Sequence, residues 1–249
     1  MKGSDCLGKT FTSNKCGDFV VIEYEDYDNV VVKFTTTGSV VTTQLYHVKD
    51  GGIKDRMFPS VYGVGILGDA VASENGVKLK EYQVWRGLLS RCYNSKTKVR
   101  SPSYEGCDVS TNFKYYPYFK DWCNKQVGFN QEGFELDKDI LIKGNKIYAA
   151  DTCCFVPKEI NLLFCKSNSL RGSYPIGVSL NKKSGKFKAS MTCGNVLKSL
   201  GNYATPEEAF LAYKKAKEAH IKEVANKWRD NIDPRVYEAL MNWNVDITD

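Results

Sequence analysis

The strongest constraint on the fold lies in residues 174–208, where short β-type segments lead directly into a helix start. Polar and apolar side chains alternate in residues 186–192, as they do in a strand with one buried face. Three short strands are predicted at 174–178, 185–191 and 199–203, with turns at Ser184-Gly185 and Cys193-Gly194. This spacing predicts a small antiparallel sheet.

The helix signal that follows is specific. Thr205-Pro206-Glu207-Glu208 places a capping hydroxyl, a first-turn proline and a capping-box glutamate in order, which predicts a helix from near Pro206. One face of this helix is expected to carry Ala209, Tyr213, Ala216, His220 and Val224. On that apolar stripe His220 is interpreted as a core or boundary histidine, not as a ligand. A second helix is predicted from Asp233-Pro234, with Val236, Leu240 and Trp243 packing back.

The first 70 residues predict a separate β module. The segments 19–24, 30–34 and 40–43 are rich in β-branched and aromatic residues and are separated by good turn sequences. Gly51-Gly52 and residues 63–65 are expected to form a connector. Two roles remain open for this module: packing, or contact with a DNA backbone.

The middle of the chain, residues 78–168, predicts helices and a small strand-turn-strand-helix unit. Apolar residues at helical spacing surround Trp85, and aromatic residues are frequent from there to Trp122. Residues 135–161 then predict two strands and a helix start, with Asp137 closing the first strand and Asn161 opening the helix. With residues 171–249 as the third domain, the fold class expected for the whole chain is α+β.

Four cysteines of this middle part could hold zinc or could be buried apolar residues: Cys92, Cys107, Cys153 and Cys154. None belongs to a Cys-x-x-Cys pair, and adjacent cysteines rarely bind one ion together. Burial as small hydrophobic residues is therefore the favoured interpretation.

Residues 135–161 resemble the ββα-metal unit of phage-type HNH, or His-Me finger, homing endonucleases. In that family the first strand ends in Asp-His or Asn-His, and a second-strand Asn precedes a helix Asn by nine residues. Here Asp137 and Asn161 stand at the two metal-ligand positions. Lys138 replaces the general-base His, and Thr152 replaces the second-strand Asn. The resemblance implies aromatic helices packed under the unit and one divalent ion, Mg²⁺ or Mn²⁺.

The replacement at position 138 leaves several mechanisms open. Lys138 could be a desolvated base, or a cation that stabilises the transition state. It could also simply grip a phosphate in a site that no longer cuts. Asp139 is a candidate substitute base or third metal ligand, and a solvated charge run would explain the Asp-Lys-Asp cluster without any chemistry.

The segment from Tyr174 to about Lys217 resembles the plant ethylene-response-factor, or Apetala-type, DNA-binding domain. The likeness rests on Tyr174 with Gly177-Val178, on Gly185-Lys186-Phe187 with Ala189, and on Leu200-Gly201 followed by the capping box and Ala212-Tyr213. This domain is often fused to phage HNH nucleases. The family lays one face of its sheet in the major groove of DNA. The side chains expected there are Ser179, Asn181, Lys182, Lys183, Lys186, Lys188, Ser190, Thr192 and, least securely, Lys198.

Lysine and serine stand where the family has arginines and a tryptophan. Because lysine acts mainly as a point charge toward phosphate, sequence preference is expected to be softer than in the plant domains. A generic solvated sheet face is the alternative.

Composition limits the class of protein but says little about its function. The 249-residue chain has a net charge of +6, which weakly favours a polyanionic partner. Nine cysteines without a preceding signal peptide favour a reducing cytosol, and no apolar run approaches the length needed to span a bilayer. No small-molecule cofactor is expected.

Two function classes follow: a metal-dependent DNA endonuclease or nickase of homing type, or a DNA-binding repressor or interference factor built on a decayed nuclease unit. Either would act on double-stranded DNA in the cytoplasm of a bacterial host, encoded by a phage or mobile element.

Overall fold

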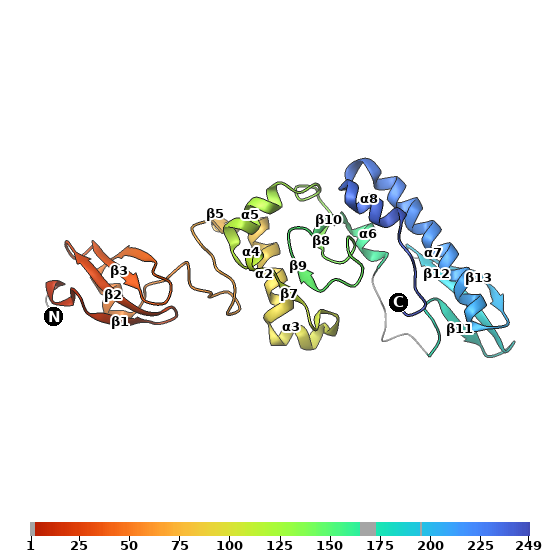
Figure 1. Ribbon diagram of the computed structural model, residues 1–249, viewed down its shortest axis with the longest axis horizontal. Coiled ribbons are helices and arrows are strands. Elements are labelled where there is room, and N and C mark those ends of the chain that lie inside the picture. Colours follow the sequence, from red (N-terminus) through yellow and green to blue (C-terminus); the bar gives the residue numbers. More distant parts are fainter. Residues whose placement is uncertain (1–2, 165–172, 195) are drawn as a thin grey trace. The chain divides into compact units, whose positions relative to one another are not determined.

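The computed structural model describes residues 3–164, 173–194 and 196–249 (Figure 1). The chain forms two compact units: unit 1 is Met1–Asn124 with Lys146–Ala150, and unit 2 is Lys125–Asn145 with Asp151–Asp249. Both contain helices and antiparallel sheets, which confirms the α+β class. The domain boundary predicted between 168 and 171 lies outside the described residues.

The N-terminal sheet of unit 1 is a four-stranded antiparallel meander. Its strands, in spatial and sequence order, are β1 (Thr10–Ser13), β2 (Gly17–Tyr24), β3 (Val30–Phe34) and β4 (Val40–Thr43). Alternation along β2 and β3 buries Phe19, Val21, Val32 and Phe34 on one face. The three predicted strands are confirmed. A short 3₁₀ turn, η1 (Gly3–Cys6), and β1 were not predicted.

Short elements lie on both sides of the predicted connector. Helix α1 (Leu45–Asp50) buries Leu45 and Val48 and ends at Gly51, whose φ of 70° only glycine adopts readily. A hairpin follows, formed by β5 (Ser73–Glu74) and β6 (Val77–Lys78). Its turn residues Asn75 and Gly76 both have positive φ, as a two-residue hairpin turn requires.

Aromatic packing holds the helical part of unit 1 together. Its elements are α2 (Lys80–Tyr93), α3 (Ser95–Arg100), η2 (Pro102–Tyr104), β7 (Asp108–Val109), α4 (Thr111–Lys114), α5 (Tyr116–Asn124) and β9 (Ile147–Tyr148). Trp85, Phe113 and Phe119 are fully buried, and the Trp85 Nε1 donates to the Phe113 carbonyl at 2.7 Å. Strand β9 returns to pair in parallel with β7. The predicted helix at Trp85 is confirmed.

Unit 2 begins with the predicted strand-turn-strand-helix. Strand β8 (Phe134–Asp137) pairs antiparallel with β10 (Cys154–Pro157), and α6 (Lys158–Leu162) follows directly. Two details differ from expectation. Asn161 is the fourth residue of α6, because Pro157 caps the helix and Lys158 opens it. Thr152 lies in a turn before β10, not in the strand.

The C-terminal sheet has the predicted order. Strands β11 (Val178–Asn181), β12 (Lys186–Cys193) and β13 (Val196–Tyr203) form an antiparallel sheet, and α7 (Pro206–Trp228) packs along it (Figure 1). The Thr205–Glu208 capping box is present. The first strand starts at Val178 and not at Tyr174, since Gly177 has a φ of 76°, which is incompatible with an extended strand.

The buried stripe of α7 is wider than predicted. Ala209, Tyr213 and Val224 are buried as expected, and Phe210, Ile221 and Ala225 join them. His220 is part exposed, with its Nδ1 3.4 Å from Glu223 Oε2, which fits a boundary position. After η4 (Arg229–Asn231), α8 (Pro234–Met241) is capped by Asp233 and buries Val236 and Leu240.

Gly177 gives the first prediction, because it lies where the C-terminal sheet contacts Tyr213 of α7. A Cβ at this position would lie 2.1 Å from the Tyr213 ring. Gly177→Ala should therefore lower the free energy of unfolding of unit 2 by about 2 kcal/mol, through overpacking and a strained φ. Gly185→Ala is the matched control: its φ is 68°, but no atom lies within 4 Å of the added Cβ. Amide hydrogen exchange of β12 measures both, and equal effects of the two variants would contradict the steric argument.

Candidate functional site

One face of the C-terminal sheet carries the side chains predicted to contact DNA. The strand register pairs Ser179 with Lys188 and Asn181 with Lys186, so these four side chains share a face. On β12, Ala189 and Met191 are buried under α7. The side away from the helix therefore carries Lys186, Lys188, Ser190 and Thr192. The alternation predicted for this strand is confirmed.

We call this side of the sheet the open face: Ser179, Asn181, Lys186, Lys188, Ser190, Thr192 and their β13 partners Leu197, Ser199 and Asn202. Residues 173–206, which span the sheet, contain five lysines and no Asp or Glu. Positive charge on the open face therefore has no acidic counterpart within its own strands. Hydroxyl and amide groups between the lysines add neutral hydrogen-bonding capacity.

The turn between β11 and β12 extends the positive charge. Lys182 and Lys183 are exposed there, and the Asn181 side chain accepts from the Lys183 backbone N–H at 3.1 Å. Two backbone N–H groups of the turn, from Ser184 and Gly185, also donate to the Asn181 carbonyl. The turn is thus ordered by its own hydrogen bonds, and both lysine side chains extend from its surface.

Lys198 is the exception among the predicted contacts. A β-bulge between Ala189 and Ser190 leaves Leu200 unpaired, and beyond it Lys198 pairs with the buried Met191. The backbone therefore directs Lys198 to the opposite side of the sheet from Lys186 and Lys188, where it is exposed. Leu197, which is 65% exposed, takes the place on the open face that Lys198 was expected to hold.

In the ββα unit, Asp137 is held at the end of β8. Its Oδ1 accepts the backbone N–H groups of Asp139 and Ile140, each at 2.8 Å. Burial, followed by the charge of Asp139, raises the pKa of Asp137 to about 6, although these two N–H groups and Lys138 oppose the shift. Within the described residues no hydrogen-bond donor reaches Oδ2. A cation at Oδ2 would offset the desolvation and repulsion that this carboxylate experiences.

The surroundings of Lys138 do not favour the catalytic role predicted for it. Its side chain is only 9% exposed, and Nζ lies 3.1 Å from Asp139 Oδ2. The following loop is tied to the same residue, because Asn145 donates to the Lys138 carbonyl at 2.6 Å. A buried, ion-paired ammonium has little access to a phosphate group, so the structure supports a packing role more than the catalytic one predicted for Lys138. Asp139 is occupied by this ion pair, yet its side chain is 45% exposed.

Asn161 reaches the strand that carries Asp137. Its Nδ2 donates to Glu135 Oε2 at 2.7 Å, and Glu135 lies two residues before Asp137, on the same side of β8. The structure thus brings Asn161 to the face of Asp137, as the metal-ligand prediction requires. Glu135 was missed in the sequence because its importance depends on this contact across 26 residues.

Asp137 and Asn161 suit a divalent ion that needs few protein ligands. Carboxylate and amide oxygens are suitable ligands for Mg²⁺ or Mn²⁺. No group of three or more His, Cys, Asp or Glu side chains suited to a metal occurs in the part of the chain that the structure describes. An ion at Asp137 and Asn161 would therefore have two protein ligands and would take the rest from water or a phosphate.

Helix α6 is anchored to α7 by a carboxylate. Glu159 Oε2 accepts from Lys227 Nζ at 2.6 Å and from Trp228 Nε1 at 2.7 Å. These bonds lower the pKa of Glu159 below its ordinary value. The helix that bears Asn161 is in this way fixed to the helix that covers the C-terminal sheet.

This anchor gives the second prediction. Glu159→Ala should weaken protection of the α6 amides by about 1 kcal/mol, a modest value because the side chain is 43% exposed. Glu159→Gln should cost less, since it keeps an acceptor for Trp228. Hydrogen exchange of α6 measures both. An Ala variant with unchanged protection would show that the anchor adds nothing.

The four cysteines weighed as zinc ligands are all buried. Burial raises the pKa of the Cys92 thiol to about 12, and it raises that of Cys154 as well. Neutral thiols packed as small apolar groups fit this environment.

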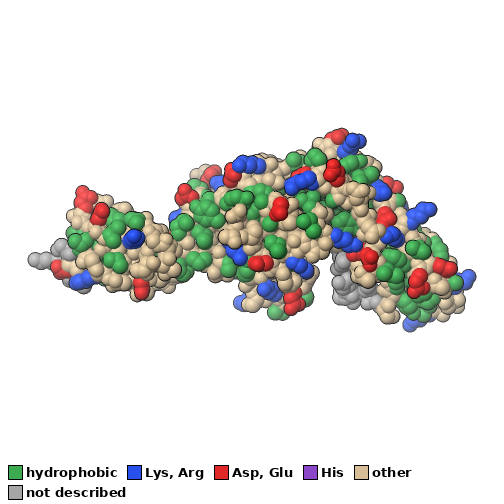
Figure 2. Space-filling model, in the orientation of Figure 1, with side chains coloured by type: hydrophobic (Ala, Val, Ile, Leu, Met, Phe, Trp, Pro, Cys, Tyr) green, Lys and Arg blue, Asp and Glu red, His purple; other side chains and the backbone are tan. Residues whose placement is uncertain are grey.

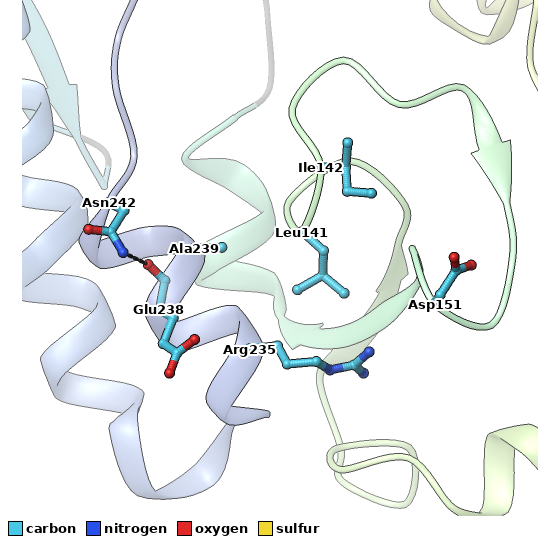
Figure 3. A pocket seen from close by; sticks show the side chains of 7 residues that line it. All are labelled: Leu141, Ile142, Asp151, Arg235, Glu238, Ala239 and Asn242. Carbon is cyan, nitrogen blue, oxygen red and sulfur yellow. Dashed lines mark hydrogen bonds between the residues drawn. The ribbon is translucent and has the colours of Figure 1, made fainter.

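A shallow pocket next to the ββα unit does not gather the predicted residues. Figure 3 shows it between the loop of Leu141 and Ile142 on one side and α8 on the other. Asp151, Arg235 and Glu238 contribute charges of both signs. Arg235 is already held by Asp233, with Nη2 2.7 Å from Oδ2. The pocket therefore offers no concentrated charge for a ligand.

Charge on the visible face of the molecule is mixed. On the face drawn in Figure 2, basic and acidic side chains alternate without a large patch of one sign. The acid-free sheet is for this reason a local feature and not a consequence of the net charge of +6.

Comparisons with known proteins leave both resemblances as interpretations of the residues alone. No family model, curated protein or solved structure matches the chain. Among the helices of the described segments, none has the length and apolar character needed to cross a bilayer.

Proposed function

We propose that the chain binds double-stranded DNA through the open face and cleaves or nicks it at the ββα unit with one divalent ion. The observation that carries the binding proposal is the sheet itself: lysines, hydroxyls and amides share one face, and residues 173–206 lack acidic side chains. A two- or three-stranded β surface can enter the major groove, which is about 12 Å wide. Its substrate would be phage or host DNA in the bacterial cytoplasm.

The lysines and the neutral polar side chains of the open face would contact different parts of the DNA. Lys186 and Lys188 would contact phosphates, which gives affinity but little sequence information. Ser179, Asn181 and Ser190 are the groups able to hydrogen-bond base edges. Because no arginine fork is present on these strands, discrimination between sequences should be modest.

Cleavage is supported by the geometry around Asp137. Its carboxylate is oriented by two backbone N–H groups, and Asn161 reaches the same side of β8 through Glu135. Asp137 and Asn161 would hold Mg²⁺ or Mn²⁺, which would supply Lewis acidity at the scissile phosphate. Glu135 is then the nearby carboxylate able to accept a proton from the attacking water, a role that Lys138 in its ion pair does not fill.

A second candidate function is DNA binding without cleavage, as a repressor or interference factor. The burial of Lys138 favours it, since the position of the family's general base is here taken by an ion-paired side chain. The two candidates predict the same binding and differ only in strand breakage.

One experiment separates them. The purified chain is incubated with plasmid, phage and host genomic DNA in Mg²⁺, Mn²⁺ or EDTA, and breaks are mapped by sequencing of the ends. The proposal predicts breaks that depend on the metal and recur at preferred sites. Binding without any break in either metal would establish the second candidate, and failure to bind any duplex would exclude both.

A further inference from the structure

The last turn of α2 in unit 1 carries an arginine that contacts two tyrosine rings. The Arg91 Cζ lies 5.6 Å from the ring centroid of Tyr104 and 5.4 Å from that of Tyr148. Its Nε is buried and finds no hydrogen-bond partner in the described parts of the chain. None of the ion pairs among the described residues includes this guanidinium. Arg91 is therefore a cation positioned by aromatic rings alone.

This arrangement leaves hydrogen-bonding capacity unused. Cation–π contacts stabilise the charge, but they satisfy none of the five N–H donors of a guanidinium. Unmade hydrogen bonds in a partly desolvated site favour a ligand that supplies acceptors. The planar guanidinium matches two oxygens of a phosphate, and the rings limit its rotation before the ligand arrives.

The charges around Arg91 point to the same class of ligand. The basic side chains of the adjoining elements are Lys96, Lys98 and Arg100 on α3, Lys114 on α4 and Lys146 next to β9. The acidic ones are Glu105 and Asp108. Asp108 accepts from the Tyr93 hydroxyl and has Lys114 Nζ 3.6 Å from Oδ1, so its charge is already engaged. The balance is positive.

We infer that Arg91 binds a phosphate of the DNA backbone, with Tyr104 and Tyr148 fixing its guanidinium and the α3 bases adding attraction. This inference rests on the proposed DNA-binding function and adds a second contact surface, in unit 1, to the open face in unit 2.

The test compares three variants of the full chain in DNA-binding titrations over a range of salt. Arg91→Gln removes the charge, whereas Arg91→Lys keeps it above the rings without the planar fork. Arg86→Gln is the matched control, because Arg86 lies on the same helix and stacks on Tyr62 at 6.0 Å. Thermal unfolding without DNA verifies that each variant folds. If Arg91→Gln does not fold, Arg91→Lys still tests the contact.

The inference predicts that Arg91→Gln weakens duplex binding about 10-fold and lowers the salt slope by about 0.9. Arg91→Lys should keep the slope and lose about 3-fold, while Arg86→Gln stays within about 2-fold. Wild-type affinity and slope in both Arg91 variants, or an equal loss in Arg86→Gln, would overturn the inference and leave the open face intact. If the wild type binds no DNA, the proposed function itself fails.

A second experiment tests whether the phosphate that Arg91 binds belongs to DNA or is free phosphate. Hydrogen exchange of the last turn of α2 is measured with duplex DNA and, separately, with inorganic phosphate at equal ionic strength. Protection by DNA alone is the expected result. Equal protection by inorganic phosphate would replace the DNA contact with a site for free phosphate.

Discussion

Asp137→Asn should reduce Mg²⁺-dependent cleavage about a thousandfold while leaving DNA affinity within about 2-fold of wild type. The amide keeps an oxygen for the N–H groups of Asp139 and Ile140, so the turn after β8 persists. What disappears is the negative charge that would hold the ion and, with it, the stabilisation of the transition state. Binding should persist because the proposed phosphate contacts lie on the open face.

Two controls make this prediction specific. Asp230→Asn removes an exposed carboxylate from the same unit and should cut like the wild type. Mg²⁺ or Mn²⁺ should also raise the melting temperature of the wild type and not that of Asp137→Asn, because an ion that binds only the folded state stabilises it. Full activity and an unchanged metal response in Asp137→Asn would place the chemistry at another site.

Neutralising the open face should have the second large effect, on affinity. Lys186→Gln combined with Lys188→Gln should weaken duplex binding about 50-fold at moderate salt and lower the salt slope by about 1.8, the value for two lost phosphate contacts. The matched control removes two charges from the exposed side of α7, in Lys215→Gln with Lys222→Gln. Titrations by fluorescence anisotropy measure the wild type and the two double variants. Equal losses in the two double variants would mean that only net charge matters.

The elements of the fold that were predictable are those encoded by neighbouring residues. The alternation in β12 and the Thr205–Glu208 capping box are local patterns, and both appear in the structure. Gly177 shows the limit of such patterns. Its positive φ makes the first strand of the C-terminal sheet begin at Val178. Its close approach to Tyr213 is not visible without the helix in place.

The positions of the candidate site residues in the fold were predictable, but their contacts were less so. The sequence placed Asp137 at a strand end and Asn161 in the following helix, and both positions hold apart from the helix start. The burial of Lys138 and the Asn161–Glu135 contact depend on tertiary packing, which spacing along the chain does not report. Lys198 changed sides because of a bulge, a one-residue irregularity that reverses every side chain beyond it.

The central claim is that the open face meets the DNA, and amide chemical shifts of the isotope-labelled chain, titrated with a short duplex, test it most directly. The account predicts that the largest changes fall on Ser179, Lys186, Lys188 and Ser190, while exposed positions of α7 such as Lys215 and Lys222 change little. Changes concentrated on α7, with β11 and β12 unaffected at saturating DNA, would contradict it.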